Sequence, residues 1–295
     1  VFGQTYKRGD GEMNVLSLFD GMSCGRIALE RANIDVGTYY ASEIDKGATI
    51  VSEANYPNTI QLGDVTNWRE WDIDWSDIDL LIGGSPCQGF SFAGKQLAFD
   101  DPRSKLFFVY VDILNHIRSV NPDVKFMLEN VRMKKEYLDV ISEHLGVEPE
   151  FINSGESSPC DRPRFYWANW NFTKPPHSDI DFISTVGNDF VEMSPGWHKW
   201  WIEKSNFQLR KAYSKVCTHG DKGVCMKARQ YANWNGNFIE SRPGVFAKPN
   251  NKALARLVGA PSDYLESVSQ RKAEELTGNG WTVDVIAHIL RGAFP

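Results

Sequence analysis

This chain of 295 residues lacks several features that define common protein classes. Its five cysteines form no CxxC pair, so we expect neither a disulfide framework nor a structural zinc site. Cys217, His219 and Cys225 have no fourth ligand at a suitable spacing, so the sequence predicts no bound metal. No apolar run approaches the roughly twenty residues that cross a bilayer, and no signal pattern opens the chain. We therefore expect an intracellular protein that binds no membrane.

The charged residues are unevenly placed along the chain. A formal net charge of −6 argues by itself against a nucleic-acid partner, but placement matters more than the sum. Residues 64–79 are rich in aspartate and glutamate, whereas residues 199–229 contain two acidic residues and eight basic ones. The basic residues are Lys199, Lys204, Arg210, Lys211, Lys215, Lys222, Lys227 and Arg229. This later segment predicts a basic surface on an acidic protein.

Short apolar runs alternate with helix-length segments through the first part of the chain. The expected strands are 15–19, 38–42, 60–62, 78–82 and 124–128. Such alternation is typical of an α/β fold with a parallel sheet. The proline-rich stretch 173–177 ends the pattern, and no clear period follows until a helical signal returns at Asn251. We expect a strong terminal helix over 281–290, opened by 278–280.

Acidic residues follow the first three expected strands. Asp20 precedes the Gly21 turn, Glu43 ends the second strand, and Asp64 follows the third. Ligands of open α/β sheets bind at this edge, where Gly21 and Gly25 would let the backbone approach a ligand. Glu43 could accept hydrogen bonds from ribose hydroxyls or remain a solvated charge, and Asp64 could accept one from an adenine amino group. The absence of a P-loop favours adenosine without a phosphate chain.

Cys87 follows the apolar strand that ends at Gly83-Gly84. Pro86 and Gly89 fix a non-helical turn around it. A thiol in this place can act as a nucleophile if a neighbour lowers its pKa or takes its proton. For an arbitrary cysteine, a small buried side chain at a strand end is the commoner interpretation.

Three further polar residues are expected near Cys87. Glu129 lies at the end of the strand 124–128, one crevice position away, where a protonated carboxyl could donate to a substrate ring nitrogen. Arg162 and Arg164 are two apart on an extended segment and so point the same way. They could bind a phosphate or a carbonyl oxygen. The polar loop 89–103 is long enough to close over such a site.

These motifs also occur in a recognisable order. They are FDGMSCG at 19–25, Glu43, Asp64, GGSPCQGFSFAGK at 83–95, ENV at 129–131, RPR at 162–164 and GNGWTVDVIAHIL at 278–290. Together they resemble the cytosine-5 DNA methyltransferases, from about Asn14 to Ala293. The loop after Cys87 looks like that of the bacterial enzymes, whereas the carboxyl-terminal motifs are similar to the animal de novo DNA methyltransferases. Cys160 stands where the family often has glutamine, so that glutamine's role is not carried over.

The resemblance implies a fold and partners. It implies a Rossmann-like α/β sheet with helices on both faces, which binds S-adenosyl-L-methionine, and a smaller irregular target-recognition domain, which binds double-stranded DNA. The catalytic domain would comprise residues 13–172 and 249–295, the target-recognition domain residues 173–248, and residues 1–12 an extension outside the fold. The terminal helix would pack back beside the first strand. A monomer is favoured, located in the cytoplasm or nucleoid if the protein is bacterial or phage-encoded.

The resemblance also implies roles for individual residues. Cys87 would add to cytosine C6 of a base flipped out of the duplex, Glu129 would hold N3, and Arg164 would bind O2. Arg162 would support the loop or bind a backbone phosphate. The implied cofactor contacts are Phe19, Asp20, Gly21, Gly25, Glu43, Ile44, Asp64, Val65, Pro86, Asn279, Gly280 and Trp281.

Three alternatives remain open from the sequence. The same fold could methylate transfer RNA, although the Cys-Phe-Thr tripeptide of that branch is absent. The chain could be a non-catalytic, DNA-binding regulatory homologue, which the intact Cys87, Glu129 and Arg164 argue against. A group other than methyl could be carried on the sulfonium.

Overall fold

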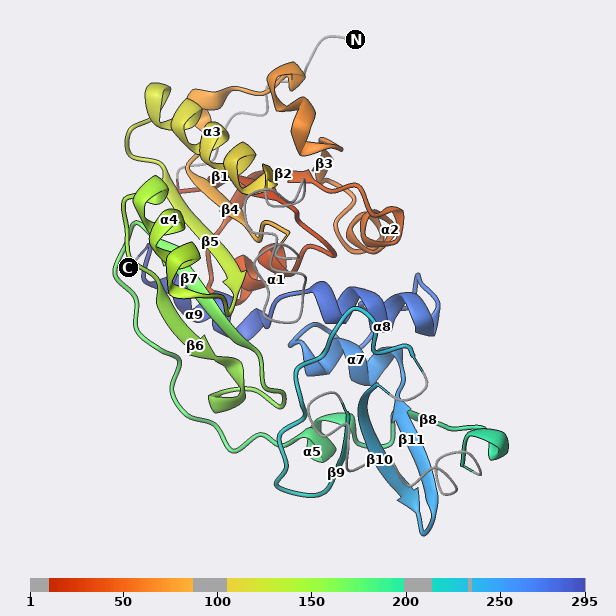
Figure 1. Ribbon diagram of the computed structural model, residues 1–295. Coiled ribbons are helices and arrows are strands. Elements are labelled where there is room, and N and C mark those ends of the chain that lie inside the picture. Colours follow the sequence, from red (N-terminus) through yellow and green to blue (C-terminus); the bar gives the residue numbers. More distant parts are fainter. Residues whose placement is uncertain (1–10, 87–104, 199–213, 233–234, 295) are drawn as a thin grey trace.

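The larger of two sheets forms the centre of the molecule. The computed structural model describes residues 11–86, 105–198, 214–232 and 235–294, and in these ranges seven strands pair in the order β3-β2-β1-β4-β5-β7-β6 (Figure 1). Their bounds are β1 (Met13–Leu18), β2 (Val36–Ser42), β3 (Ile60–Gln61), β4 (Leu80–Gly83), β5 (Lys125–Val131), β6 (Glu150–Asn153) and β7 (Pro163–Ala168). The strands from β3 to β5 are parallel, and β7 runs antiparallel to both of its neighbours. The predicted α/β fold with a mainly parallel sheet is confirmed.

Helices cover both faces of this sheet, as expected. Successive side chains of a strand point to opposite faces, so Val15 packs with α1 (Cys24–Arg31) and α9 (Val283–Arg291), whereas Leu16 and Leu18 pack with α3 (Lys105–Val120) and α4 (Lys135–Leu145). Helix α2 (Lys46–Asn55) connects β2 to β3. The last helix, α9, packs directly against α1 and shares a core with Val15.

The segment expected to be irregular contains a second, smaller sheet. Its strands pair in the order β8-β11-β10-β9 and are β8 (Phe190–Glu192), β9 (Ser214–Cys217), β10 (Gly236–Arg242) and β11 (Val245–Pro249). The short helix α5 (Phe182–Val186) precedes them. These strands have three to seven residues. Strand β9 pairs with β10 in parallel, whereas the β10–β11 and β11–β8 pairs are antiparallel. Strands so short and mixed in direction leave little periodicity in the sequence.

Two helices lie between the sheets, α7 (Asn251–Leu257) and α8 (Gln270–Asn279) (Figure 1). The Nε2 of Gln230 joins the smaller sheet's segment to α8 by donating to the backbone oxygen of Glu274 at 2.6 Å and to Thr277 Oγ1 at 3.0 Å. Residues 278–280 were expected to open the terminal helix, but Gly278 and Asn279 instead end α8, and α9 begins at Val283. The break between the helices places residues 278–281 beside the strand ends.

In the described ranges, no helix is long and apolar enough to cross a membrane. Among the same residues, no group of three or more histidine, cysteine or acidic side chains is placed to hold a metal ion. Four cysteines in these ranges carry free thiols: Cys24, Cys160 and Cys217 are buried, and Cys225 is half-buried.

Candidate active site

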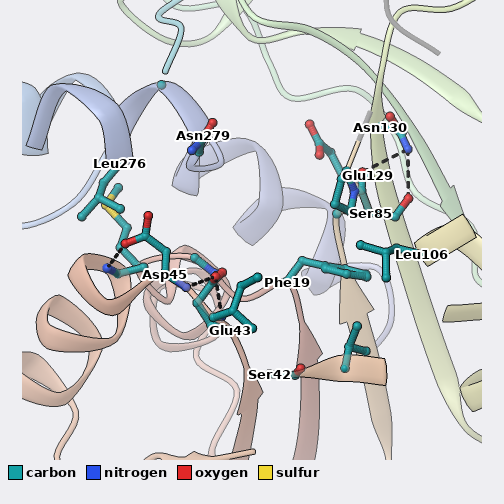
Figure 2. A pocket seen from close by; sticks show the side chains of 18 of the residues that line it. Phe19, Ser42, Glu43, Asp45, Ser85, Leu106, Glu129, Asn130, Leu276 and Asn279 are labelled. Carbon is teal, nitrogen blue, oxygen red and sulfur yellow. Dashed lines mark hydrogen bonds between the residues drawn. The ribbon is translucent and has the colours of Figure 1, made fainter. Parts of the chain in front are cut away.

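A cavity of about 350 Å³ lies at the carboxyl ends of the parallel strands (Figure 2). Many residues predicted from the sequence line it: Phe19, Gly21, Glu43, Ile44, Asp64, Val65, Pro86, Glu129, Arg162, Arg164 and Asn279. The sequence did not identify a further set that also lines it: Met22, Ser42, Asp45, Ala48, Gly63, Gly84, Ser85, Leu106, Asn130, Val131, Leu276 and Gly278. The cavity therefore brings together motifs that are up to 260 residues apart, between Phe19 and Asn279.

The turn after β1 forms one wall of the cavity. Phe19, Gly21 and Ser23 all adopt positive φ angles, near 60°, which L-residues other than glycine rarely do. The half-buried Asp20 stabilises this turn, since its carboxylate accepts hydrogen bonds from Tyr39 Oη at 2.7 Å and Ser23 Oγ at 2.5 Å. Burial raises the pKa of Asp20. Asp20 thus holds the turn through its hydrogen bonds and does not line the cavity, although the sequence predicted that it contacts a cofactor.

Glu43 joins two loops at the mouth of the cavity. Its Oε2 accepts a hydrogen bond from the Gly21 amide at 2.8 Å, and its Oε1 accepts from the amides of Ile44 at 2.7 Å and Asp45 at 2.8 Å. A carboxylate oxygen can accept two hydrogen bonds, so Oε2 keeps one further acceptor site beside the cavity. Ile44 is 74% exposed at the same rim, which leaves a large apolar side chain facing the opening.

Two more aspartates cap helices next to Glu43. Asp45 is the N-cap of α2: its Oδ1 accepts from the amides of Gly47 and Ala48, and Lys272 of α8 pairs with Oδ2 at 3.2 Å. Asp64 caps the short 3-10 helix Val65–Glu70, and its Oδ1 accepts both the amide and the hydroxyl of Thr66 at 2.8 Å. The carboxyl groups at this end of the cavity are thereby held in fixed orientations.

An acidic and a basic side chain meet at the other end of the cavity. Glu129 of β5 and Arg164 of the antiparallel neighbour β7 form an ion pair, with Arg164 Nε 2.6 Å from Glu129 Oε1. Their side chains are only 9% and 12% exposed. Because water is largely excluded, the pair interacts more strongly than a surface ion pair would. The structure thus brings together two of the residues that the sequence places near Cys87.

Arg162 makes different contacts from those expected. Its guanidinium is buried and donates to the backbone oxygens of Gly278 and Asn279, each at 3.3 Å. Burial lowers the pKa of Arg162. The side chain therefore connects the start of β7 to the end of α8, where it supports the cavity wall. The predicted support of the loop lies outside the described residues, and the contact with a phosphate stays a prediction.

Asn130 connects β5 to the segment that leads to Cys87. Its Nδ2 donates to Ser85 Oγ at 3.2 Å, and its Oδ1 accepts the Val131 amide at 2.8 Å. Ser85, which Figure 2 labels, lines the cavity, and so does Pro86. Cys87 itself, the loop 88–103 and the basic residues Lys199, Lys204, Arg210 and Lys211 lie outside the described residues. Residues 84–86, the last described before Cys87, thus lie in the cavity wall, and Gly84 is next to Glu129.

Two lysines of the basic segment are used within the fold. Lys222 Nζ donates to the backbone oxygens of Ser158, Ser178 and Ile180, at 3.1, 2.8 and 2.6 Å. Lys215 forms an ion pair with Asp221 at 2.9 Å. Lys222 thus joins separate backbone segments, and Lys215 is paired within the segment of the smaller sheet. The basic surface expected at 199–229 therefore has fewer unengaged charges than the sequence suggests.

Substitution of Gly278 by alanine is expected to lower the free energy of unfolding by about 2 kcal/mol or more. A Cβ at this position would lie 2.1 Å from Lys227 C and 2.2 Å from Ala228 N, and main-chain atoms cannot rotate away as a side chain can. Urea denaturation would measure the loss. Gly196→Ala is the matched control, because its Cβ would meet no atom within 4 Å. Equal stability of the Gly278 variant and the wild type would contradict the close contact.

Comparison of the sequence with known proteins identifies a family and several relatives of this chain. The family model for C-5 cytosine-specific DNA methylases matches residues 13–145. Type II methyltransferase M.NlaX of Neisseria lactamica is 30% identical over 306 residues, which cover 93% of this chain and 94% of that protein. Type II methyltransferase M1.ScrFI of Lactococcus lactis subsp. cremoris is 38% identical over 314 residues, covering 95% and 77%.

Solved structures show the same fold at lower identity. The Entamoeba histolytica methyltransferase EhMeth superposes with a TM-score of 0.74 at 16% identity, covering 96% of this chain and 98% of that one. A mutant of Spodoptera frugiperda DNMT2 gives a TM-score of 0.69 at 18% identity, covering 96% and 100%. The extent of these matches, and of the two type II enzymes above all, confirms the resemblance found in the motifs: the chain belongs to the C-5 cytosine-specific DNA methylase family.

Proposed function

We propose that the protein transfers a methyl group from S-adenosyl-L-methionine to C5 of cytosine in double-stranded DNA. The observation that carries the proposal is that the two ends of one cavity present different kinds of side chain. One end presents carboxylates and an exposed apolar side chain, and the other presents the Glu129–Arg164 pair beside the segment that leads to Cys87. The first end suits a nucleoside, and the second suits a base that must be polarised.

The described residues at the first end fit the adenosine of the cofactor. Glu43 Oε2 has acceptor capacity for a ribose hydroxyl, Asp64 can accept from the adenine amino group, and Ile44 offers an apolar surface to the ring. Among the described residues that line the cavity, the only basic ones are Arg162 and Arg164, at its other end. A mouth lined by carboxylates, with no lysine among the described lining residues, suits a cofactor without phosphates. When bound, the cofactor supplies an electrophilic methyl group on its sulfonium.

The protein's residues would make a poorly nucleophilic carbon reactive. In the proposed step, the Cys87 thiolate forms a bond to C6 of cytosine, and the ring electrons move toward N3, where Glu129 donates a proton. Arg164 would hold the O2 carbonyl and stabilise the charge that develops there. The resulting enamine would attack the methyl group through C5, so that the methyl–sulfur bond breaks and S-adenosyl-L-homocysteine leaves. Loss of the C5 proton to solvent would then expel Cys87 as the thiolate, and N3 would return its proton to Glu129, which restores the aromatic ring.

The target base must leave the duplex to reach this cavity. Unstacking costs a few kcal/mol, so the enzyme needs contacts with the flanking DNA. We assign these to the target-recognition domain, residues 173–248, which contains the smaller sheet, with residues 13–172 and 249–295 as the catalytic domain. Backbone phosphates would be held by the cations of this domain that the fold does not use internally.

A methylation assay with two nucleic acids tests the proposal. The protein is incubated with labelled S-adenosyl-L-methionine and either DNA that contains many sequence contexts or bulk transfer RNA, and modified cytosines are then located at base resolution. We expect 5-methylcytosine in DNA in a defined context. Label in transfer RNA alone would favour the RNA enzyme. Binding of cofactor and DNA without any transfer would favour a regulatory role.

A further inference from the structure

Trp281 lies in the break between α8 and α9 and contacts the acidic end of the Glu129–Arg164 pair. Its Nε1 donates a hydrogen bond to Glu129 Oε2 at 3.2 Å. The other carboxylate oxygen, Oε1, faces Arg164 Nε at 2.6 Å. Each carboxyl oxygen of Glu129 therefore has its own partner. Oε1 faces the guanidinium of Arg164 on β7, and Oε2 accepts the indole N–H of Trp281 near the carboxyl terminus.

This pair of contacts fixes the plane of the carboxyl group. The terminal torsion of a glutamate side chain is broad, so a carboxyl group without partners samples many orientations. An indole N–H can only donate a hydrogen bond. Trp281 therefore binds Glu129 at a lone pair of the acceptor Oε2. With Arg164 as the ion-pair partner of Oε1 and Trp281 as the hydrogen-bond donor to Oε2, the carboxyl group is held from both sides.

Two glycines leave room for the indole ring. A Cβ on Gly84 would lie 3.0 Å from Glu129 Oε2 and 3.1 Å from Trp281 Nε1, directly beside their hydrogen bond. A Cβ on Gly25 would lie 2.6 Å from Ile82 Cδ1 and 3.3 Å from Trp281 Cζ3. Gly25, expected to admit a cofactor, thus admits the ring of Trp281. Glycine at both places is what allows the indole to reach Glu129.

The indole does not belong to the set of described residues that line the cavity, although Asn279 and Leu276 of the same region do. From these contacts we infer that Trp281 is a positioning residue: it orients Glu129 for proton donation to the base and is not a cofactor contact. The inference rests on the proposed methyl transfer. It concerns the chemical step and leaves cofactor affinity unchanged.

Substitution of Trp281 by phenylalanine separates the two roles. Phenylalanine keeps an aromatic ring but removes the N–H. We expect the single-turnover rate of methyl transfer to DNA to fall about 10-fold or more, as for loss of a hydrogen bond to a charged group. The dissociation constant of S-adenosyl-L-homocysteine, measured by calorimetry, should change less than twofold. Trp170→Phe is the matched control, since its Nε1 donates to the backbone oxygen of Ile289 in α9, away from the cavity; its rate should equal that of the wild type.

A double-mutant cycle tests whether Trp281 acts through Glu129. In a Glu129→Ala background, where the acceptor is gone, Trp281→Phe should change the residual rate by less than twofold. A tenfold or greater effect of Trp281→Phe in that background would overturn the inference. A wild-type rate in the Trp281→Phe single variant would also overturn it, as would a weaker cofactor affinity of this variant at an unchanged single-turnover rate. Failure of the wild-type protein to methylate DNA in the same assay would instead refute the proposed function, and the positioning role with it.

Discussion

Glu129→Gln is expected to lower the single-turnover rate of methyl transfer by about 10²- to 10⁴-fold, the usual contribution of a positioned proton donor. Glutamine has nearly the same shape but cannot deliver a proton to N3. It also leaves the Arg164 guanidinium, 12% exposed, without the carboxylate that lies 2.6 Å away. Both effects act on the base, so the affinity for S-adenosyl-L-homocysteine should stay near that of the wild type.

Glu274→Gln is the matched control for this substitution. Glu274 is also a buried carboxyl, on α8, and burial raises its pKa. A neutral isostere there removes no proton donor from the cavity. We expect its transfer rate to lie within about twofold of the wild type, whereas a comparable loss in both variants would mean that the Glu129 effect is one of folding and not of chemistry.

Cys87→Ala is expected to abolish methyl transfer while cofactor binding persists. Without the thiolate no bond forms to C6, and C5 remains a poor nucleophile. DNA that carries 5-fluorocytosine gives a direct readout. The proposed reaction must lose a proton from C5, and fluorine cannot leave as a cation, so the wild-type protein should remain covalently bound to the DNA after methyl transfer. A denaturing gel would show this adduct for the wild type and none for the variant.

Cys225→Ala controls for the loss of a thiol. Cys225 is half-buried and free, and it lies outside the cavity lining. This variant should still form the covalent adduct with fluorinated DNA. Adduct formation by the Cys87 variant would assign the nucleophile to another residue.

The end of the cavity that contains Phe19, Glu43 and Asp64 was predictable because these residues follow strands directly. Each comes within three residues of the carboxyl end of its strand, and parallel strands bring such ends to one edge. Local sequence is sufficient for this inference. The same rule placed Glu129 near the carboxyl end of β5, two strands beyond β1 in the sheet.

Contacts between distant segments were not predictable in the same way. Arg162 turns toward the backbone oxygens of Gly278 and Asn279, over a hundred residues away, and Trp281 turns toward Glu129. Neither direction follows from spacing along the chain. Asp20 looked like a ligand contact because it follows β1, but positive φ angles at Phe19 and Gly21 turn its carboxylate inward to Tyr39. Such backbone conformations are visible only in three dimensions.

The contact between Gly278 and the Lys227–Ala228 peptide has a consequence for protein engineering. Residues 227–230 belong to the segment that carries the smaller sheet. They nevertheless pack against α8, the helix whose carboxyl-terminal end lines the cavity. A chimaera that receives the smaller sheet of another enzyme, to redirect it to a new sequence, would therefore need its splice points outside 227–230, or a matching α8 from the same donor. With the proposed role of the smaller sheet in DNA recognition, an exchange of specificity would require two segments, the one that carries this sheet and α8.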